Sequence, residues 1–204
     1  AGFYVLTVVD TTEPKKTLDT QQIVVLRAQD PDLTAADSIF GVFGASDFPD
    51  IARRIGAKWA VTTNQWAWRQ KSEDAALDDS AMDSIRGIRA LGMEPIILID
   101  TAPPWANGDK EPTVPPDEKH YRQWVQFNEN VARALAGHVT WYQSWNEPNN
   151  NFAFTWDQKT NMAKAKMVQR LQYQGLKKGD PQAKLMGGCF AGVPADWFVA
   201  WLTE

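Results

Sequence analysis

One acidic residue follows an expected strand at a position that suits acid–base chemistry. The apolar run from Val139 to Trp145 predicts a buried strand, and it is followed by the turn formers Asn146, Glu147, Pro148 and Asn149. In an α/β barrel, side chains at the carboxyl ends of the strands point into the active site. A carboxylate there, beside an amide and among tryptophans, is suited to proton transfer, so we interpret Glu147 as a candidate general acid or base.

Strands and helices alternate along the chain on both sides of this motif. The expected strands are Ile39–Phe43, Lys58–Thr62, Pro95–Ile99, Val139–Trp145 and Lys184–Cys189, and the expected helices are Asp47–Ile55, Asp74–Leu91, Asp117–Leu135, Gln158–Lys178 and Asp196–Leu202. Such alternation requires a parallel sheet with helices outside it. The segment Gly41-Val42-Phe43-Gly44 is too short for a dinucleotide-binding fingerprint, which disfavours a doubly wound nucleotide fold.

The number of residues predicts a barrel that is incomplete. A (β/α)8 barrel takes roughly 250 residues, whereas positions 39–204 make up 166 residues (204 − 38) and hold five expected strands. We therefore expect an α/β fold of the (β/α)8 TIM-barrel type with about the first five β/α units, over residues 38–204. Five strands would leave two unpaired edges, which proteins avoid exposing.

The N-terminal region has a different pattern. The β-rich runs Phe3–Val9 and Thr20–Arg27 flank a segment of turn formers and predict a hairpin. An isolated hairpin is marginal in water, so we interpret residues 1–27 as the tail of a β-sandwich module and residues 28–37 as a linker. The chain begins inside a strand-like run, without an initiator methionine or signal peptide, so we expect a processed or excised start.

Composition excludes several classes of function. The 204 residues carry a net charge of −4 without a basic stripe, so we expect no nucleic-acid partner. The apolar runs are too short and interrupted to span a bilayer. Cys189 is the only cysteine, which rules out an internal disulfide. His120 and His138 lack metal-ligand spacing with other ligand types, so we expect neither a metal nor a cofactor.

The content of tryptophan is unusually high, with ten in 204 residues. Trp66, Trp105 and Trp145 follow or end expected strands, so they either fill the core or form flat apolar walls for sugar rings. Trp59 we expect in the core. Asp100 ends the third expected strand and begins a long loop, where a sugar-hydroxyl contact or a loop cap suits it better than a catalytic role.

Four segments together resemble a known group of enzymes. They are Phe40-Gly41-Val42; Ile55-Gly56-Ala57-Lys58-Trp59 with Trp66; Gly92-Met93-Glu94-Pro95-Ile96 with Pro103-Pro104-Trp105-Ala106; and Trp145-Asn146-Glu147-Pro148-Asn149. The chain resembles the clan of retaining (β/α)8 glycoside hydrolases, and within it the family of β-xylosidases and α-L-iduronidases with its bacterial relatives. The last segment is the most specific of the four.

The resemblance implies a role for two of the candidate residues. Glu147 would be the acid/base, and Asn146 would hold the sugar 2-hydroxyl. Substrate contacts are expected from Trp66, Trp105, Trp145, Asn149 and Asp100. The substrate would be a poly- or oligosaccharide, and the protein would be secreted, periplasmic or on the cell surface.

The sequence departs from the family pattern in two ways. Ala60 and Val61 stand where the family has an arginine after the tryptophan of the second strand. The nucleophile, a glutamate that ends the seventh strand in this clan, has no counterpart because no seventh strand is expected. By itself the chain should be inactive. The alternatives are a non-catalytic carbohydrate-binding or structural protein on a degenerate barrel, and a partner chain that supplies the missing half.

Overall fold

A computed structural model describes most of the chain, in eight ranges. They are residues 2–10, 16–25, 41–44, 48–76, 81–150, 158–187, 189–192 and 195–203. The expected linker at 28–37 lies outside the described residues, as does the start of the strand expected from Ile39. The described strands form two separate sheets, one of two strands and one of five.

The first sheet is the predicted hairpin. Strand β1 (Gly2–Asp10) pairs antiparallel with β2 (Lys16–Val25), with a register shift between Val8 and Val9. Neighbouring residues of a strand point to opposite faces, and Tyr4, Val5 and Leu6 are all exposed. At these described positions, neither face of the hairpin is therefore packed. Its assignment to a β-sandwich module stays a prediction.

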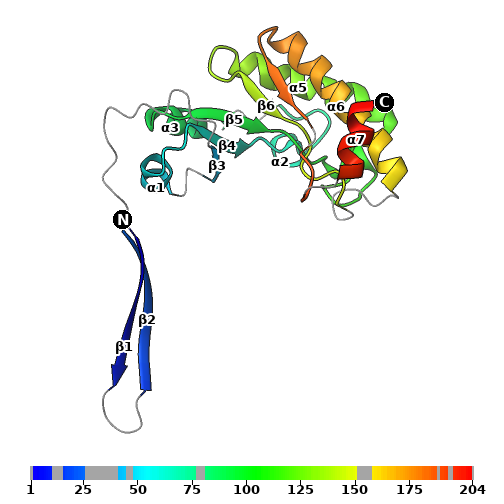
Figure 1. The fold of residues 1–204 in the computed structure, drawn as a ribbon. Coiled ribbons are helices and arrows are strands. Elements are labelled where there is room, and N and C mark those ends of the chain that lie inside the picture. Colours follow the sequence, from blue (N-terminus) through cyan, green and yellow to red (C-terminus); the bar gives the residue numbers. More distant parts are fainter. Residues whose placement is uncertain are drawn as a thin grey trace.

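The second sheet is parallel, and its strands follow one another in space as they do in sequence. They are β3 (Gly41–Phe43), β4 (Trp59–Thr63), β5 (Glu94–Leu98), β6 (Trp141–Gln143) and β7 (Lys184–Met186). The order is β3-β4-β5-β6-β7 (Figure 1). A doubly wound sheet reverses its strand order at a switch point, and this sheet does not. The arrangement is that of an open segment of a (β/α)8 barrel.

The helices connect these strands in the predicted alternation. They are α1 (Pro49–Arg54), α2 (Trp66–Arg69), α3 (Ala81–Ala90), α4 (Pro104–Asn107), the 3-10 turn η2 (Glu118–His120), α5 (Tyr121–Leu135), α6 (Gln158–Gly179) and α7 (Ala195–Thr203). The single-turn helices α2 and α4 lie in segments predicted to be loops. In the described ranges no helix is both long enough and apolar enough to cross a bilayer.

One face of the five-stranded sheet packs against the helices. Ala60, Ile97 and Tyr142 lie on that face and have no exposed surface. The large core there includes Ile85 of α3 and Phe127 of α5, both of them buried. Burying apolar surface of this kind is the main favourable term in folding, so this face carries the hydrophobic core of the parallel sheet.

Helices α5 and α6 lie side by side at close range (Figure 1). Gly175 and Gly179 of α6 make this approach possible. A Cβ atom at Gly175 would lie 2.8 Å from the Cβ of Asn128, and one at Gly179 would lie 2.8 Å from the Cβ of Ala132. Glycine is required at both positions because any side chain would meet the backbone of α5.

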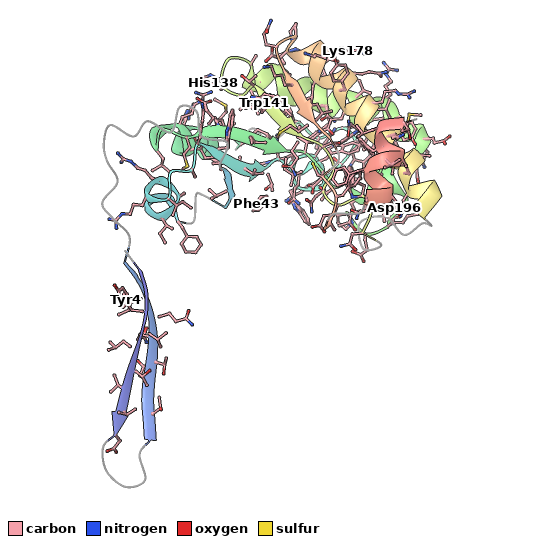
Figure 2. All side chains as sticks on the ribbon, in the orientation of Figure 1. Tyr4, Phe43, His138, Trp141, Lys178 and Asp196 are labelled. Carbon is pink, nitrogen blue, oxygen red and sulfur yellow. The ribbon has the colours of Figure 1, made fainter. Side chains whose placement is uncertain are left out.

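The opposite, concave face of the sheet is open. A hollow of about 320 Å³ is lined by Gly41, Trp59, Ile96, Trp141 and Met186, and the rings of Trp59 and Trp141 meet edge to face at 6.3 Å. Figure 2 shows side chains crowded among the helices, with the labelled Phe43 at the margin of this mass. Phe43 is 68% exposed. In a closed barrel this face is a packed interior.

Candidate active site

The carboxyl ends of four strands form one aligned edge. Thr63, Leu98, Gln143 and Met186 are in register across β4, β5, β6 and β7. Backbone pairing continues one residue further, because the N–H groups of Asn64, Ile99 and Ser144 donate to carbonyls of this row at 2.8, 3.1 and 2.9 Å. The segments after these strands therefore leave from the same edge, where barrel enzymes build their sites.

Glu147 is held at this edge in an unusual backbone conformation. Its φ is +46°, in the left-handed region that non-glycine residues rarely adopt. Its N–H donates to the carbonyl of Cys189 at 2.7 Å, and its own carbonyl accepts from the N–H of Asn150 at 2.9 Å. The side-chain amide of Asn150 donates to Glu147 Oε2 at 3.2 Å. Strain of this kind persists where the surroundings hold it and gathers at functional sites.

The residues on either side of Glu147 differ in what they can offer a ligand. Asn146 is exposed, so its amide is accessible. Asn149 is half-buried, and both polar atoms of its side chain bond to Ala191. Pro148 is buried. The expected contacts of Asn146 and Asn149 with substrate stay predictions.

Asp100 lies two residues beyond the end of β5, the strand next to β6. Ile97 and Ile99, which precede it, belong to the core under the helices. Asp100 is 8% exposed, and burial raises its pKa to about 6, against a lowering by a hydrogen bond with the side chain of Gln65. Its Oδ1 has no hydrogen-bond partner among the described residues.

The three candidate tryptophans are unequally placed. Trp66 is 0% exposed, with its ring 5.4 Å from that of Trp124 and 5.3 Å from that of Trp105. Trp145 is 4% exposed and packs 5.7 Å from Trp124. Trp105 is half-buried, and its Nε1 donates to the carbonyl of Gln70 at 3.1 Å. Trp66 and Trp145 therefore lie in the core, whereas Trp105 is partly exposed.

A polar group after β4 was missed by the sequence analysis. Gln65 reaches Asp100, and it accepts a hydrogen bond at 2.6 Å from Nε1 of Trp68, whose ring is 58% exposed. Asn64 Oδ1 accepts from Nε of Arg69 at 2.9 Å. Asn64 and Gln65 directly follow β4, which ends at Thr63, one residue later than the strand predicted there.

Packing explains why β4 has Ala60 where the resembled family has an arginine after the tryptophan. Ala60 has no exposed surface and packs with Ala52 and Met93 between the sheet and its helices. A guanidinium there would lose its hydration without gaining a partner. Arg69 brings a positive charge to the same edge from α2 instead.

The described residues contain no metal centre. Nowhere in the described ranges do three His, Cys, Asp or Glu side chains gather in a way that would hold an ion. The groups that follow the strand ends at this edge are the carboxyl groups of Glu147 and Asp100, side-chain amides, aromatic rings and the guanidinium of Arg69.

Comparison with solved structures identifies the architecture. A family 39 glycoside hydrolase from the gut symbiont Bacteroides cellulosilyticus WH2 matches 98% of this chain with a TM-score of 0.68 and 18% identity. A monomeric β-xylosidase from Caulobacter crescentus CB15 matches 78% with a TM-score of 0.57 and 15% identity. The GH53 catalytic domain of Ignisphaera aggregans matches 88% with a TM-score of 0.55 and 22% identity.

The matches cover only part of each solved protein. This chain spans 41%, 38% and 58% of those three chains, respectively. No protein-family model matches the sequence, and no curated protein matches it either. Identities this low show the fold alone. The predicted resemblance to (β/α)8 glycoside hydrolases and the predicted partial α/β barrel are confirmed at that level.

Proposed function

We propose that the parent protein is a retaining glycoside hydrolase acting on a poly- or oligosaccharide, and that Glu147 is its acid/base. The observation that carries the proposal is the conformation of Glu147. A carboxylate in a left-handed conformation at the carboxyl edge of a parallel sheet is held there at a cost in free energy. The fold around it is one that glycoside hydrolases share, which supports this reaction over others that need a carboxylate.

Retaining hydrolysis requires two carboxyl groups about 5–5.5 Å apart. One attacks the anomeric carbon and displaces the leaving oxygen, while the other donates a proton to that oxygen. The second carboxylate then takes a proton from water as the water attacks the anomeric carbon and releases the sugar. Glu147 is assigned the proton transfers, and the nucleophile is assigned to a strand beyond the five described.

The remaining substrate contacts are assigned from the accessibility of the side chains at this edge. Asn146 has an exposed amide, which suits a bond to the sugar 2-hydroxyl. Trp105 offers a partly exposed ring at the same edge. Asp100 is assigned a sugar-hydroxyl contact through the oxygen that lacks a partner, once a ligand or a small rotation uncovers it. A polymeric substrate fits a secreted, periplasmic or cell-surface protein.

Closure of the barrel is part of the proposal. Among the described residues β3 pairs only with β4, and β7 only with β6. The concave hollow between them is lined by apolar side chains. Three further β/α units, from the same polypeptide or from another, would pair both edges, fill the hollow and bring the nucleophile opposite Glu147.

The test is a substrate panel on the full-length protein with a matched pair of variants. Wild type, Glu147→Gln and Glu118→Gln are assayed on 4-nitrophenyl glycosides and on oligosaccharides. Glu118 is an exposed glutamate of η2 and serves as the control. Removal of a general acid/base costs about 10²–10⁴ in rate, so Glu147→Gln should lose that much on substrates with poor leaving groups.

Each outcome decides the proposal. Turnover that falls in Glu147→Gln and persists in Glu118→Gln supports it. Turnover that is equal in all three proteins would remove Glu147 from the reaction. Sugar binding by the full-length protein without any turnover would favour a carbohydrate-binding protein.

A further inference from the structure

We infer that Asn149 is a positioning residue that holds Glu147 in its left-handed conformation by tying the loop after β6 to the loop after β7. This inference rests on the proposed function for its catalytic meaning, but its structural part stands on contacts alone. It assigns Asn149 a role other than the substrate contact expected from the family resemblance.

The contacts form a two-point clamp. Asn149 Nδ2 donates to the carbonyl of Ala191 at 3.0 Å, and the N–H of Ala191 donates to Asn149 Oδ1 at 2.7 Å. The amide of Asn149 thus pairs with one backbone residue in the way that a neighbouring strand would. The pairing also fixes the orientation of the amide. A flipped amide would place its NH₂ group against the N–H of Ala191 and its oxygen against the carbonyl of Ala191.

The clamp lies beside the hydrogen bond that matters for Glu147. Two residues before Asn149, the N–H of Glu147 donates to Cys189, which is two residues before Ala191. The segments 147–149 and 189–191 therefore run together and are joined at both ends. A left-handed conformation costs an L-residue free energy. The two hydrogen bonds at Asn149 contribute to offsetting that cost.

Positioning explains why Asn149 would matter without touching a sugar. Two of the four hydrogen bonds that its amide can make already go to the backbone of Ala191, so the amide is oriented by that residue before any sugar binds. A displacement of about 1 Å at a reacting group can cost about a hundredfold in rate. Holding the Glu147 segment to the loop after β7 limits such displacement.

The test that is independent of activity is amide hydrogen exchange on the 204-residue chain. Asn149→Ala removes both bonds, and Asn149→Asp removes only the donor while the carboxylate still accepts from Ala191. We expect exchange at the Glu147 and Ala191 amides to rise about tenfold or more in Asn149→Ala and by less in Asn149→Asp. Asn130→Ala, on α5, is the control and should leave both amides unchanged.

Protection of the Glu147 amide that is equal in wild type and Asn149→Ala would overturn the inference. If protection is lost at this edge and the amides of α5 keep theirs, the effect is local and not a failure to fold. Asn149→Asp guards against a fold-wide effect of alanine because it keeps the size of the side chain.

Kinetics of the full-length protein separate positioning from substrate contact. If the proposed hydrolase activity is present, Asn149→Ala should lower kcat at least tenfold with KM within about twofold. A raised KM with unchanged kcat would show that Asn149 binds substrate and would overturn the inference. If the wild type has no activity, the proposed function fails while the exchange result still decides the clamp.

Discussion

At the scale of single residues, the buried carboxyl group of Asp100 makes the stability of the fold depend on pH. Its pKa of about 6 lies above the ordinary value of 3.8 because burial disfavours the charged form. The folded chain therefore binds more protons than the unfolded chain between these two values. Asp100 contributes stability below pH 4, and this contribution is lost as pH rises through 6.

Asn in place of Asp100 removes this dependence on pH. Asp100→Asn should be more stable relative to wild type at pH 7 than at pH 4, by up to about 3 kcal/mol. Urea unfolding of both proteins at the two pH values measures the difference. A stability difference that is the same at both pH values would mean that Asp100 is not a buried acid.

Cys189 gives a second prediction at this scale. Burial raises the pKa of its thiol to about 11, against lowering by hydrogen bonds with Gln143 and Ser144. Because the thiolate is the reactive form, alkylation at pH 8 should be about a hundredfold slower in the native chain than in urea. Mass spectrometry after iodoacetamide treatment reports it cleanly, since the chain has one cysteine. Equal rates in both conditions would place the thiol in solvent.

The sequence predicted which residues follow the carboxyl ends of the strands better than it predicted their exposure. Glu147 and Asp100 were identified because a polar residue at the end of an apolar strand is readable from pattern alone. The burial of Trp66 was not predictable, because it depends on Trp124 and Phe127 of a helix more than fifty positions away. The left-handed φ of Glu147 likewise depends on Cys189, which lies after β7 and more than forty positions away.

At the scale of elements, periodicity predicted the long helices and all five strands. It missed α2 and α4, because four residues make little more than one turn and show no repeat. It also predicted a seven-residue strand over Val139–Trp145, whereas β6 comprises only Trp141–Gln143. The flanking apolar residues of that run are buried by tertiary packing and not by strand pairing.

The contact between α5 and α6 yields a prediction with an internal control. Gly175→Ala should destabilise the chain by about 1–3 kcal/mol, because the added methyl group meets the backbone and Asn128 of α5. Gly87→Ala on α3 has open space and should stabilise by up to about 1 kcal/mol through helix propensity. Urea unfolding measures both. Equal effects of the two changes would mean that the helices are not in close contact.

At the scale of the whole molecule, the chain is an open segment of a barrel with an apolar concave face. The sequence predicted this from the number of strands and from the 166 residues available. It could not predict how the open face is lined, because strand residues of both faces are apolar in a parallel sheet.

An open apolar face predicts self-association of the 204-residue chain. Phe43→Lys should shift the chain toward monomer, since Phe43 is 68% exposed and the alternation of β3 puts it on the same face as Gly41, which lines the hollow. Tyr173→Lys, at an exposed position on α6, is the control and should leave association unchanged. Sedimentation velocity on the three proteins measures the distribution. A wild-type chain that is monomeric at all concentrations would contradict the proposal that this face is normally covered.

The most direct test of Glu147 as the acid/base is azide rescue of Glu147→Ala in the full-length protein. With an activated aryl glycoside the nucleophile still forms the glycosyl-enzyme, and azide, which needs no general base, should release it as a glycosyl azide of retained configuration. We predict that azide raises turnover of Glu147→Ala and leaves that of the wild type unchanged. Turnover of Glu147→Ala equal to wild type in the absence of azide would contradict the account.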